Sequence, residues 1–474
     1  MTIDLRLGDC VDILQTLDSN SVDAIVTDPP AGISFMGKEW DKDKGGRDKW
    51  ITWMSEISVE CLRVLKPGGY ALVWSLPRTS HWTGMAWEMG GFDVRDRIVY
   101  CFGSGFPKSL DVSKAIDKAA GAEREVIGPR IYGDGNGHAP SAIHYTEQAP
   151  APQSGADRVL TAPATPDAAR WQGWGTALKP AIEDWWVFRK PLSEKTVAEN
   201  CLRWGTGALA IDQCRVQHDE PIRPMKAQAH GDLVYGQSGR HEPTTELKPN
   251  GRFPANLITD GSDEVRAMFP QSKDGVAVGG YKTASSIYGN YLGRKGDAPD
   301  IGYGGQGSAS RFFAVCPLDE DDYLPLYYCA KASKSERDAG CEGMEERDAT
   351  ESTGRKPNSS GLMRDSHGGN SGNPYKGAAP VVNNARNHHP TVKPLALMRY
   401  LITLCTRSGA TVLDPFMGSG STGVACVQLE RSFIGCELDP EYMDIARARI
   451  MAATPDKVEL PLFETEEVEK NGER

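Results

Sequence analysis

A glycine-rich stretch, DPFMGSGSTG at residues 414–423, sets the strongest limit on how this chain can fold. It stands between a predicted strand, ATVLD, and a predicted helix, STGVACVQL, and it contains the pattern G-x-G-x-x-G. Glycines at a strand-to-helix turn let the backbone approach a ligand closely. A tight turn without a ligand can have the same sequence, so the stretch is weak evidence when taken alone.

The short length of chain behind this loop makes it more informative. A nucleotide-binding sheet needs several strands after the loop, but residues 424–474 have room for about one strand, SFIGCEL, and some helix. Glu437 ends that strand, where an acidic side chain can accept hydrogen bonds from ribose hydroxyls. The remaining strands must therefore come from another part of the sequence.

The first hundred residues show the alternation that would supply those strands. IDLRL, VDAIVT, YALVWSL and residues 94–102 are predicted strands, with helical periodicity between them. Strands that alternate with helices are typical of a parallel α/β sheet. The alternation resumes after residue 393, so we expect one domain built from both ends of the chain and interrupted by the middle.

The middle of the chain differs in composition from its ends. Residues 132–169, 273–310 and 351–386 are rich in Gly, Pro, Ser and Asn, and they are predicted to be loops or linkers. Between them AIEDWWVFRKPL, within residues 181–192, is predicted to be a further strand of the sheet.

A carboxylate follows one of the N-terminal strands. Asp28 comes after the apolar run 22–26 and precedes Pro29 and Pro30, whose fixed φ angles stiffen the chain. A rigid surface turn is the ordinary explanation for such a tripeptide. Its position at the end of a strand, together with the glycine loop, favours a catalytic carboxylate instead.

The order of these motifs, Asp-Pro-Pro first and D-x-F-x-G-x-G last with a long variable segment between, closely resembles the β-class amino-DNA methyltransferases. HPTVKP, at residues 389–394, also resembles this group. The resemblance implies an α/β fold: a circularly permuted Rossmann-like sheet of an S-adenosylmethionine-dependent methyltransferase with a large inserted target-recognition region. It implies a catalytic half at residues 1–108, a target-recognition region at 109–387, a cofactor-binding half at 388–455 and an acidic tail at 456–474.

For the chemistry, the resemblance implies that the Asp28 carboxylate and the Pro29 carbonyl both accept hydrogen bonds from an exocyclic amine. Such a pair of acceptors favours a pyramidal nitrogen whose lone pair can attack a sulfonium methyl group. Pro30 adds to the stiffness of the turn that aims these acceptors.

The residue that stacks on the target base is the main departure from the family pattern. The family usually has an aromatic residue after the two prolines, which stacks on a base flipped out of the duplex, but this chain has Ala31. Phe35 and Trp40 in the following loop are candidates for that role. The alternative is that both rings pack against the sheet.

The resemblance also implies S-adenosyl-L-methionine as the methyl donor. Asp9 matches the carboxylate near the adenine amine, and Glu437 matches the ribose-binding acid. Thr391 and Lys393 match the segment that covers the methionine end. The alternative for Lys393 is an ordinary solvated lysine at the start of a helix. The loop around the methionine and ribose parts is matched by Asp414, Phe416, Gly418, Ser419 and Gly420.

The residue at position 28, the first of the Asp-Pro-Pro motif, indicates which base is the target. An aspartate here, Asp28, resembles the motif of adenine-N6 methyltransferases, whereas cytosine-N4 enzymes more commonly have Ser at this place. Methylation of cytosine N4 stays the alternative. Methylation at cytosine C5 is not expected, because it needs a cysteine nucleophile, normally after a proline, and the chain has no Pro-Cys dipeptide. More distant alternatives are a catalytically silent DNA-binding relative and a nicotinamide-dependent oxidoreductase, which would leave Asp-Pro-Pro without a role.

Double-stranded DNA is the expected partner, with sequence choice in the inserted region, where Arg and Lys are interleaved with tryptophans. The net charge of −11 at pH 7 argues against non-specific coating of nucleic acid. The resemblance also allows a second copy of the chain, in a homodimer, and a cognate restriction endonuclease as partners. Methyltransferases of this group are often found in phage and bacterial genomes.

Cysteine usage and hydropathy exclude other classes. The 11 cysteines are scattered singly without metal-ligand spacing, and the neighbours His388 and His389 are poorly arranged for one ion, so no metal site is expected. No run approaches the roughly 18 uninterrupted apolar residues of a membrane span, and MTIDLRLGDC lacks the pattern of a secretory signal. We expect a soluble, cytoplasmic protein without a membrane partner.

Overall fold

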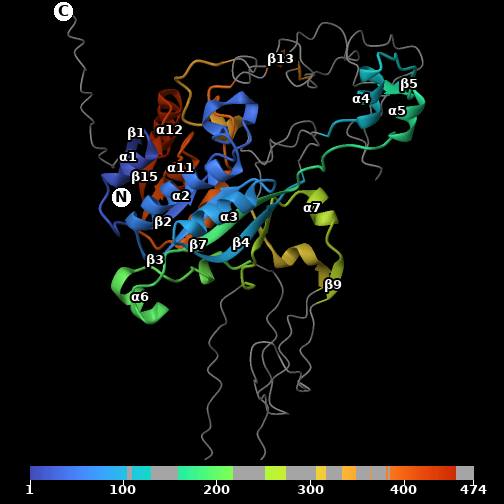
Figure 1. Ribbon diagram of the computed structural model, residues 1–474. Helices are drawn as coiled ribbons and strands as arrows, with labels where there is room; N and C mark the ends of the chain where they lie inside the picture. The colour runs from blue at the N-terminus through green and yellow to red at the C-terminus, as the bar shows by residue number, and fades with distance from the viewer. Residues whose placement is uncertain are drawn as a thin grey trace, which may run out of the picture.

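The computed structural model describes residues 1–103, 109–129, 159–216, 251–273, 306–316, 334–347, 363–364, 381–382 and 385–454. Its centre is a nine-stranded sheet in the order β1-β15-β14-β2-β3-β7-β4-β8-β11 (Figure 1). These strands are β1 (Ile3–Leu7), β15 (Ser432–Glu437), β14 (Thr411–Asp414), β2 (Val22–Thr27), β3 (Leu65–Ser75), β7 (Ile182–Arg189), β4 (Asp93–Cys101), β8 (Leu257–Thr259) and β11 (Ala314–Val315).

The strand directions make this a mixed but mostly parallel sheet. β1, β15, β14, β2 and β3 run parallel to one another, and β4, β8 and β11 do the same. β7 runs antiparallel to both β3 and β4, so it alone in the sheet opposes the common direction. The predicted Rossmann-like α/β sheet, assembled from both ends of the chain, is therefore confirmed.

Helices cover both faces of this sheet (Figure 1). Because successive side chains of a strand point to opposite faces, Ile25 lies in one buried cluster, and Ala24 and Val26 lie in the other. The cluster around Ile25 is closed by α1 (Cys10–Gln15), α2 (Arg47–Val64) and α3 (Ser80–Met89). The opposite cluster is closed by α10 (Leu395–Cys405), α11 (Ser421–Gln428) and α12 (Pro440–Ala453).

The junction between the two ends of the chain lies where β2 pairs with β14. Ala24 lies opposite Val412 and Ile25 opposite Leu413 in this parallel pair. Asp23 reinforces the junction, because its carboxylate accepts a hydrogen bond from the Thr411 amide at 2.8 Å and contacts the Lys66 ammonium at 2.6 Å. Segments almost four hundred residues apart thus share one hydrogen-bond network.

The inserted region contributes to the sheet itself. β7 lies within residues 181–192, where a further strand is expected, and it occupies an interior place between β3 and β4. β8 and β11 also come from residues 109–387 and extend one edge. The sequence does not predict these two strands, because each is too short to show an alternating pattern.

A small group of elements lies apart from the sheet, at the upper right of Figure 1. It comprises α4 (Val112–Ala119), β5 (Val126–Pro129), β6 (Val159–Thr161) and α5 (Pro166–Arg170). Asp117 organises it, because its fully buried carboxylate accepts hydrogen bonds from the Ala164 and Thr165 amides and pairs with Arg124 at 2.7 Å.

The other described elements are short. They are α6 (Val197–Trp204), α7 (Asp263–Ala267), α8 (Lys334–Asp338), the strand pair of β9 (Gln271–Lys273) with β10 (Gln306–Ser308), and the pair of β12 (Met363–Arg364) with β13 (Val381–Val382). None of the helices in the described ranges combines the length and the apolar character needed to cross a membrane. The predicted acidic tail, 456–474, lies outside the described residues.

The junction at Asp23 gives a stability prediction. Asp23→Ala removes the acceptor of the Thr411 amide and the partner of Lys66, so it should lower the free energy of unfolding by about 1–3 kcal/mol in a urea titration. Asp12→Ala, a change of an exposed carboxylate on α1, serves as the control and should cost less than about 0.5 kcal/mol. Equal stabilities for the two variants would show that this network does not join the halves.

Candidate active site

Four carboxylates lie at the carboxyl ends of four neighbouring parallel strands. Asp9 follows β1, Glu437 ends β15, Asp414 ends β14 and Asp28 follows β2, and these strands are adjacent in the order β1-β15-β14-β2. Ligands of open α/β sheets bind outside the carboxyl ends of the strands. The N-terminal and C-terminal motifs therefore meet at one edge of the sheet.

Asp414 ties the glycine loop to β2. One carboxylate oxygen accepts hydrogen bonds from the Thr27 hydroxyl at 2.6 Å and from the Phe416 amide at 3.1 Å, and the other accepts from the Thr422 hydroxyl at 2.6 Å. Burial raises the pKa of Asp414 to about 6, although these donors favour the charged form. The contacts assign Asp414 a role in shaping the loop, in addition to the ligand contact that the sequence suggests.

Glu437 holds the first glycine of the loop. Its two carboxylate oxygens accept hydrogen bonds from the amides of Gly418 and Asp439, each at 2.8 Å. Burial raises the pKa of Glu437 to about 7. Gly418 has φ +55°, and a Cβ there would lie 2.9 Å from the imidazole of His389, so only glycine fits this close approach.

The next residue of the loop, Ser419, is held by α12. The Arg449 guanidinium donates to the Ser419 carbonyl at 2.7 Å and to the Ser419 hydroxyl at 3.1 Å. Ser419 is 3% exposed, and Gly420, with φ +78°, forms the N-cap of α11. The sequence identifies the glycine loop but gives no sign that Arg449 supports it.

Asp28 is paired with a lysine from the other end of the chain. The Lys393 ammonium lies 2.9 Å from Oδ2 of Asp28, and the two side chains are 8% and 19% exposed. Burial raises the pKa of Asp28, and the charge of Lys393 opposes that rise. Because Lys393 is buried and paired, the alternative of a solvated lysine is wrong.

A second carboxylate, Glu183, faces the same ammonium. Oε2 of Glu183 lies 3.8 Å from the Lys393 Nζ and accepts a hydrogen bond from the Trp74 indole at 2.8 Å. The Trp74 ring centroid is 3.9 Å from the Lys393 Nζ. No pattern in the sequence identifies Glu183 and Trp74, because only the antiparallel return of β7 beside β3 brings Glu183 to this edge.

The loop after Asp-Pro-Pro is held in shape by a buried acid, Asp41, that is not among the residues predicted from the sequence. The Asp41 carboxylate, 1% exposed as a residue, accepts hydrogen bonds from the amides of Gly32, Ile33 and Phe35 at 3.0, 3.3 and 2.7 Å. The loop therefore returns on itself beside Asp28. A single aspartate in a polar loop carries no sequence pattern that would predict this role.

The aromatic candidates of this loop lie in different surroundings. The Trp40 ring stacks on His389 with a centroid distance of 6.4 Å and an interplanar angle of 11°, and it packs against the cluster of Tyr442 and Ile445. Phe35 is half-buried, and Ala31 packs against the cluster that contains Val26. Trp40 thus packs onto α12 and His389, and the stacking of either ring on a base stays a prediction.

The remaining predicted residues lie close to this edge. Asp9 is exposed and caps α1 by accepting from the Val11 amide at 2.8 Å, beside the strand that pairs with Glu437. The Thr391 amide donates to Nδ1 of His389 at 3.3 Å, so the imidazole is oriented from its own segment. Within the described ranges, no group of three or more His, Cys, Asp or Glu side chains could hold a metal ion.

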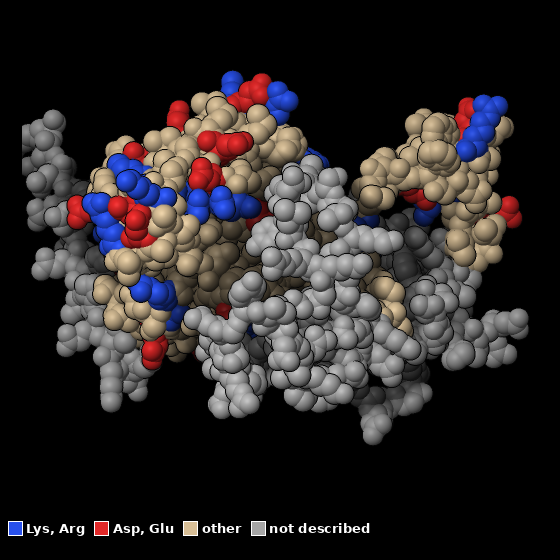
Figure 2. All heavy atoms as spheres, turned by 90° about the horizontal axis from the view of Figure 1, so that it is seen from below, with Lys and Arg blue, Asp and Glu red and all other residues tan. Residues whose placement is uncertain are grey.

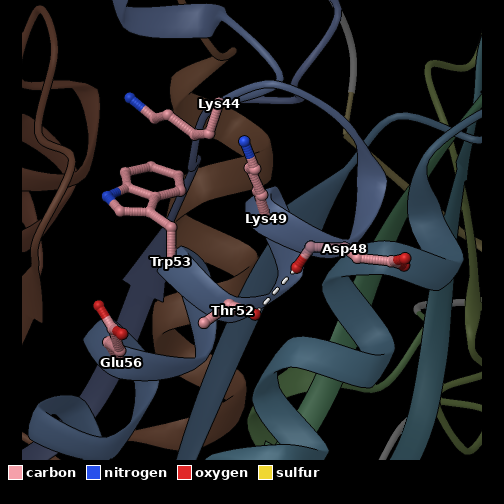
Figure 3. A pocket seen from close by; sticks show the side chains of 6 residues that line it. All are labelled: Lys44, Asp48, Lys49, Thr52, Trp53 and Glu56. Carbon is pink, nitrogen blue, oxygen red and sulfur yellow. Dashed lines mark hydrogen bonds between the residues drawn. The ribbon is translucent and has the colours of Figure 1, made fainter.

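An open depression lies beside Trp53, whose ring contacts Phe416 in the stretch 414–423. Figure 3 shows that its lining comes from the start of α2 and the residues before it: Lys44, Asp48, Lys49, Thr52, Trp53 and Glu56. Trp53 contacts Phe416, with centroids 6.2 Å apart, and the Lys44 ammonium lies 4.4 Å from the Trp53 ring. None of the predicted site residues lines this depression, so we do not place the reacting groups there.

Comparison with known proteins agrees with the two-motif arrangement. A family model described as DNA methylase matches residues 22–117 and 319–448, which contain Asp28 and the glycine loop and leave most of the inserted region unmatched. These matches support an amino-DNA methyltransferase, to which the chain is similar over the two blocks. The matched blocks thus contain the segments that meet at the common edge of the sheet.

Curated relatives match this chain over a short stretch. The type II methyltransferase M2.DpnII of Streptococcus pneumoniae is 48% identical over 64 residues, and M2.MboI of Moraxella bovis is 43% identical over 67 residues. Each match covers 14% of this chain and 24% of the relative, so the chain spans about a quarter of the length of the curated relatives it matches.

Solved structures of low identity were also found. A complex of M1.HpyAVI with SAM is 14% identical with a TM-score of 0.33, covering 95% of this chain and all of the other. PvuII DNA methyltransferase, cytosine-N4-specific, is 12% identical with a TM-score of 0.39, covering 97% and 89%. At these scores the fold assignment rests on the order of strands in the sheet of this chain.

The raised pKa of Glu437 predicts a pH-dependent stability. Its value of about 7 in the folded protein exceeds the usual 4.5, so the folded state binds this proton more tightly than the unfolded chain. The stability that protonated Glu437 provides is therefore present below pH 4.5 and is lost as the pH rises through about 7.

Glu437→Gln removes this titration. Urea unfolding of both proteins across that pH window should show the variant gaining stability relative to the wild type as the pH rises, with no further gain above about pH 7. A difference in unfolding free energy between the two proteins that is the same at every pH would contradict the raised pKa of Glu437. Such a pH-independent difference would report only the changed hydrogen bonds.

Proposed function

We propose that this methyltransferase transfers a methyl group from S-adenosyl-L-methionine to the exocyclic N6 of adenine in double-stranded DNA. The observation that carries the proposal is the meeting of Asp28 with the glycine loop 414–420 at the carboxyl ends of the adjacent strands β2 and β14. The proposal needs a binding site for the methyl donor and hydrogen-bond acceptors for the target amine at one edge, and the glycine loop and Asp28 are the residues proposed to provide them.

The residues at this edge fit the methyl donor. The Glu437 carboxylate contacts the glycine loop and is placed to accept hydrogen bonds from ribose hydroxyls. Asp9, one strand further along, is proposed to accept from the adenine amine. The tight backbone at Gly418 and Gly420 allows close approach to the methionine and ribose parts. When bound there, S-adenosylmethionine supplies an electrophilic methyl group on a positively charged sulfur.

Asp28 and Pro29 supply acceptors for the target amine. Asp28 lies in a partly buried position where hydrogen bonds to a carboxylate are strong, and the prolines fix the direction of the backbone. Two acceptors on the hydrogens of the amine favour a pyramidal nitrogen with an available lone pair. The amine becomes acidic only as it gains the methyl group, so Asp28 need not be a strong base.

Adenine is proposed over cytosine because of the Asp at position 28, as the sequence suggests. Cytosine N4 also presents an exocyclic amine and is the second outcome that the experiment must separate. Expression in a host without DNA methylation, followed by single-molecule sequencing of its DNA, identifies the modified base and its sequence context together. Modified N6-adenine at one motif supports the proposal, whereas modified N4-cytosine corrects it.

The inserted region is proposed to choose the DNA sequence. On the face seen in Figure 2, the described Lys and Arg side chains alternate with Asp and Glu and form no broad basic patch. Binding would then depend on specific contacts more than on a general positive field. A second copy of the chain and a cognate endonuclease stay predictions from the resemblance.

Asp28→Asn tests the role of the carboxylate. The variant keeps the shape of the side chain but weakens the acceptor, so methyl transfer to DNA should fall at least about 100-fold in a tritium-transfer assay. S-Adenosylmethionine binding, measured by calorimetry, should be retained. Asp12→Asn on the exposed face of α1 is the matched control and should keep full activity.

Two results would contradict the proposal. Full activity in Asp28→Asn would remove Asp28 from the chemistry. A wild-type protein that is stabilised against heat by NAD and not by S-adenosylmethionine would favour the oxidoreductase alternative.

A further inference from the structure

Glu183 has no role in the reaction as proposed, yet it stands at the same edge of the sheet. It is the second residue of β7, and an antiparallel strand begins at the edge where its parallel neighbours end. Its side chain is 8% exposed. A carboxylate buried to this degree costs free energy unless it is paired or hydrogen-bonded, so its position calls for a physical explanation.

The contacts of Glu183 form a closed group with Asp28, Lys393 and Trp74. The Lys393 Nζ is 2.9 Å from Oδ2 of Asp28 and 3.8 Å from Oε2 of Glu183. The Trp74 indole fixes Oε2 of Glu183 at 2.8 Å, and its ring face lies 3.9 Å from the same ammonium. Two carboxylates therefore share one buried cation.

This sharing bears directly on how Asp28 can accept an amine. Among the described residues, Lys393 is the side chain that donates to Asp28, so the ammonium occupies an acceptor position that the target amine needs. A buried ammonium with a single anionic partner is held strongly, because charges attract more strongly where water is excluded. A second carboxylate gives the ammonium an alternative partner close by.

Resting on the proposed function, we infer that Glu183 is a positioning residue that takes over Lys393 when the target amine enters. The ammonium moves from Asp28 toward Glu183 along the face of Trp74 and keeps its protons. Asp28 is then available to the hydrogens of the amine. Glu183 forms no covalent bond and does not contact the reacting atoms.

A purely structural role for Glu183 is the competing explanation. In that case it serves only as the acceptor for the Trp74 indole, and a neutral amide would serve equally well. Glu183→Gln separates the two, because it keeps the shape and an acceptor oxygen but removes the charge that attracts Lys393.

The first measurement is the single-turnover rate of methyl transfer with cofactor and DNA saturating. Glu183→Gln should lower this rate at least about tenfold while leaving the Kd of S-adenosylmethionine unchanged. Asp184→Asn is the matched control: Asp184 is the next residue of the strand, is also buried, and lies 3.6 Å from Arg97. The control should stay within about twofold of the wild type.

The second measurement does not depend on activity. Urea unfolding of the wild type, Asp28→Asn, Glu183→Gln and the double variant forms a complete cycle. Each single variant leaves Lys393 one carboxylate, but the double variant leaves a buried ammonium without either. The double variant should therefore lose more stability than the sum of the two single losses.

The outcomes separate this inference from the proposed function. Additive losses in the cycle overturn the inference, as does a coupled cycle with an unchanged rate in Glu183→Gln. A wild-type protein that methylates no DNA defeats the proposed function, while the cycle still decides whether the two carboxylates share Lys393. A weakened Kd for the cofactor in Glu183→Gln would reassign Glu183 to cofactor binding and also overturn the inference.

Discussion

The hydrogen bond between Thr27 and Asp414 is the contact on which the rest of the site depends. It joins the last residue of β2 to the last residue of β14 at 2.6 Å, across 387 positions of sequence. Because the two strands are also paired in register, Asp28 and the glycine loop are fixed next to one another. A permuted order of motifs gives a working site only if this junction forms.

Around that junction, buried charged groups are held by the backbone and by each other. Glu437 accepts from two amides and Asp41 from three, while Arg449 supports Ser419. Such contacts keep two loops in defined shapes before any ligand binds, which is the usual requirement for a precise site. The raised pKa values of Asp28, Asp414 and Glu437 follow from the same burial.

The sequence predicted those features that depend on local patterns. Asp28 and the glycine loop were identifiable because each follows an apolar strand, and the shortage of chain after residue 424 required strands from the N-terminal end. Asp41 and Glu183 were not identifiable, since their roles arise from side chains that meet only after the chain has folded. The stacking of Trp40 on His389 likewise joins loops from opposite ends of the chain, and no local pattern encodes it.

The central claim is that residues from both ends of the chain form one pocket for cofactor and base. A crystal structure of the full chain with S-adenosylmethionine tests it most directly. We expect the cofactor to lie against Gly418 and Gly420, with its ribose at Glu437 and its methyl group directed toward the space beside Asp28. Density for the cofactor in another part of the protein, or a methyl group directed away from Asp28, would contradict the account.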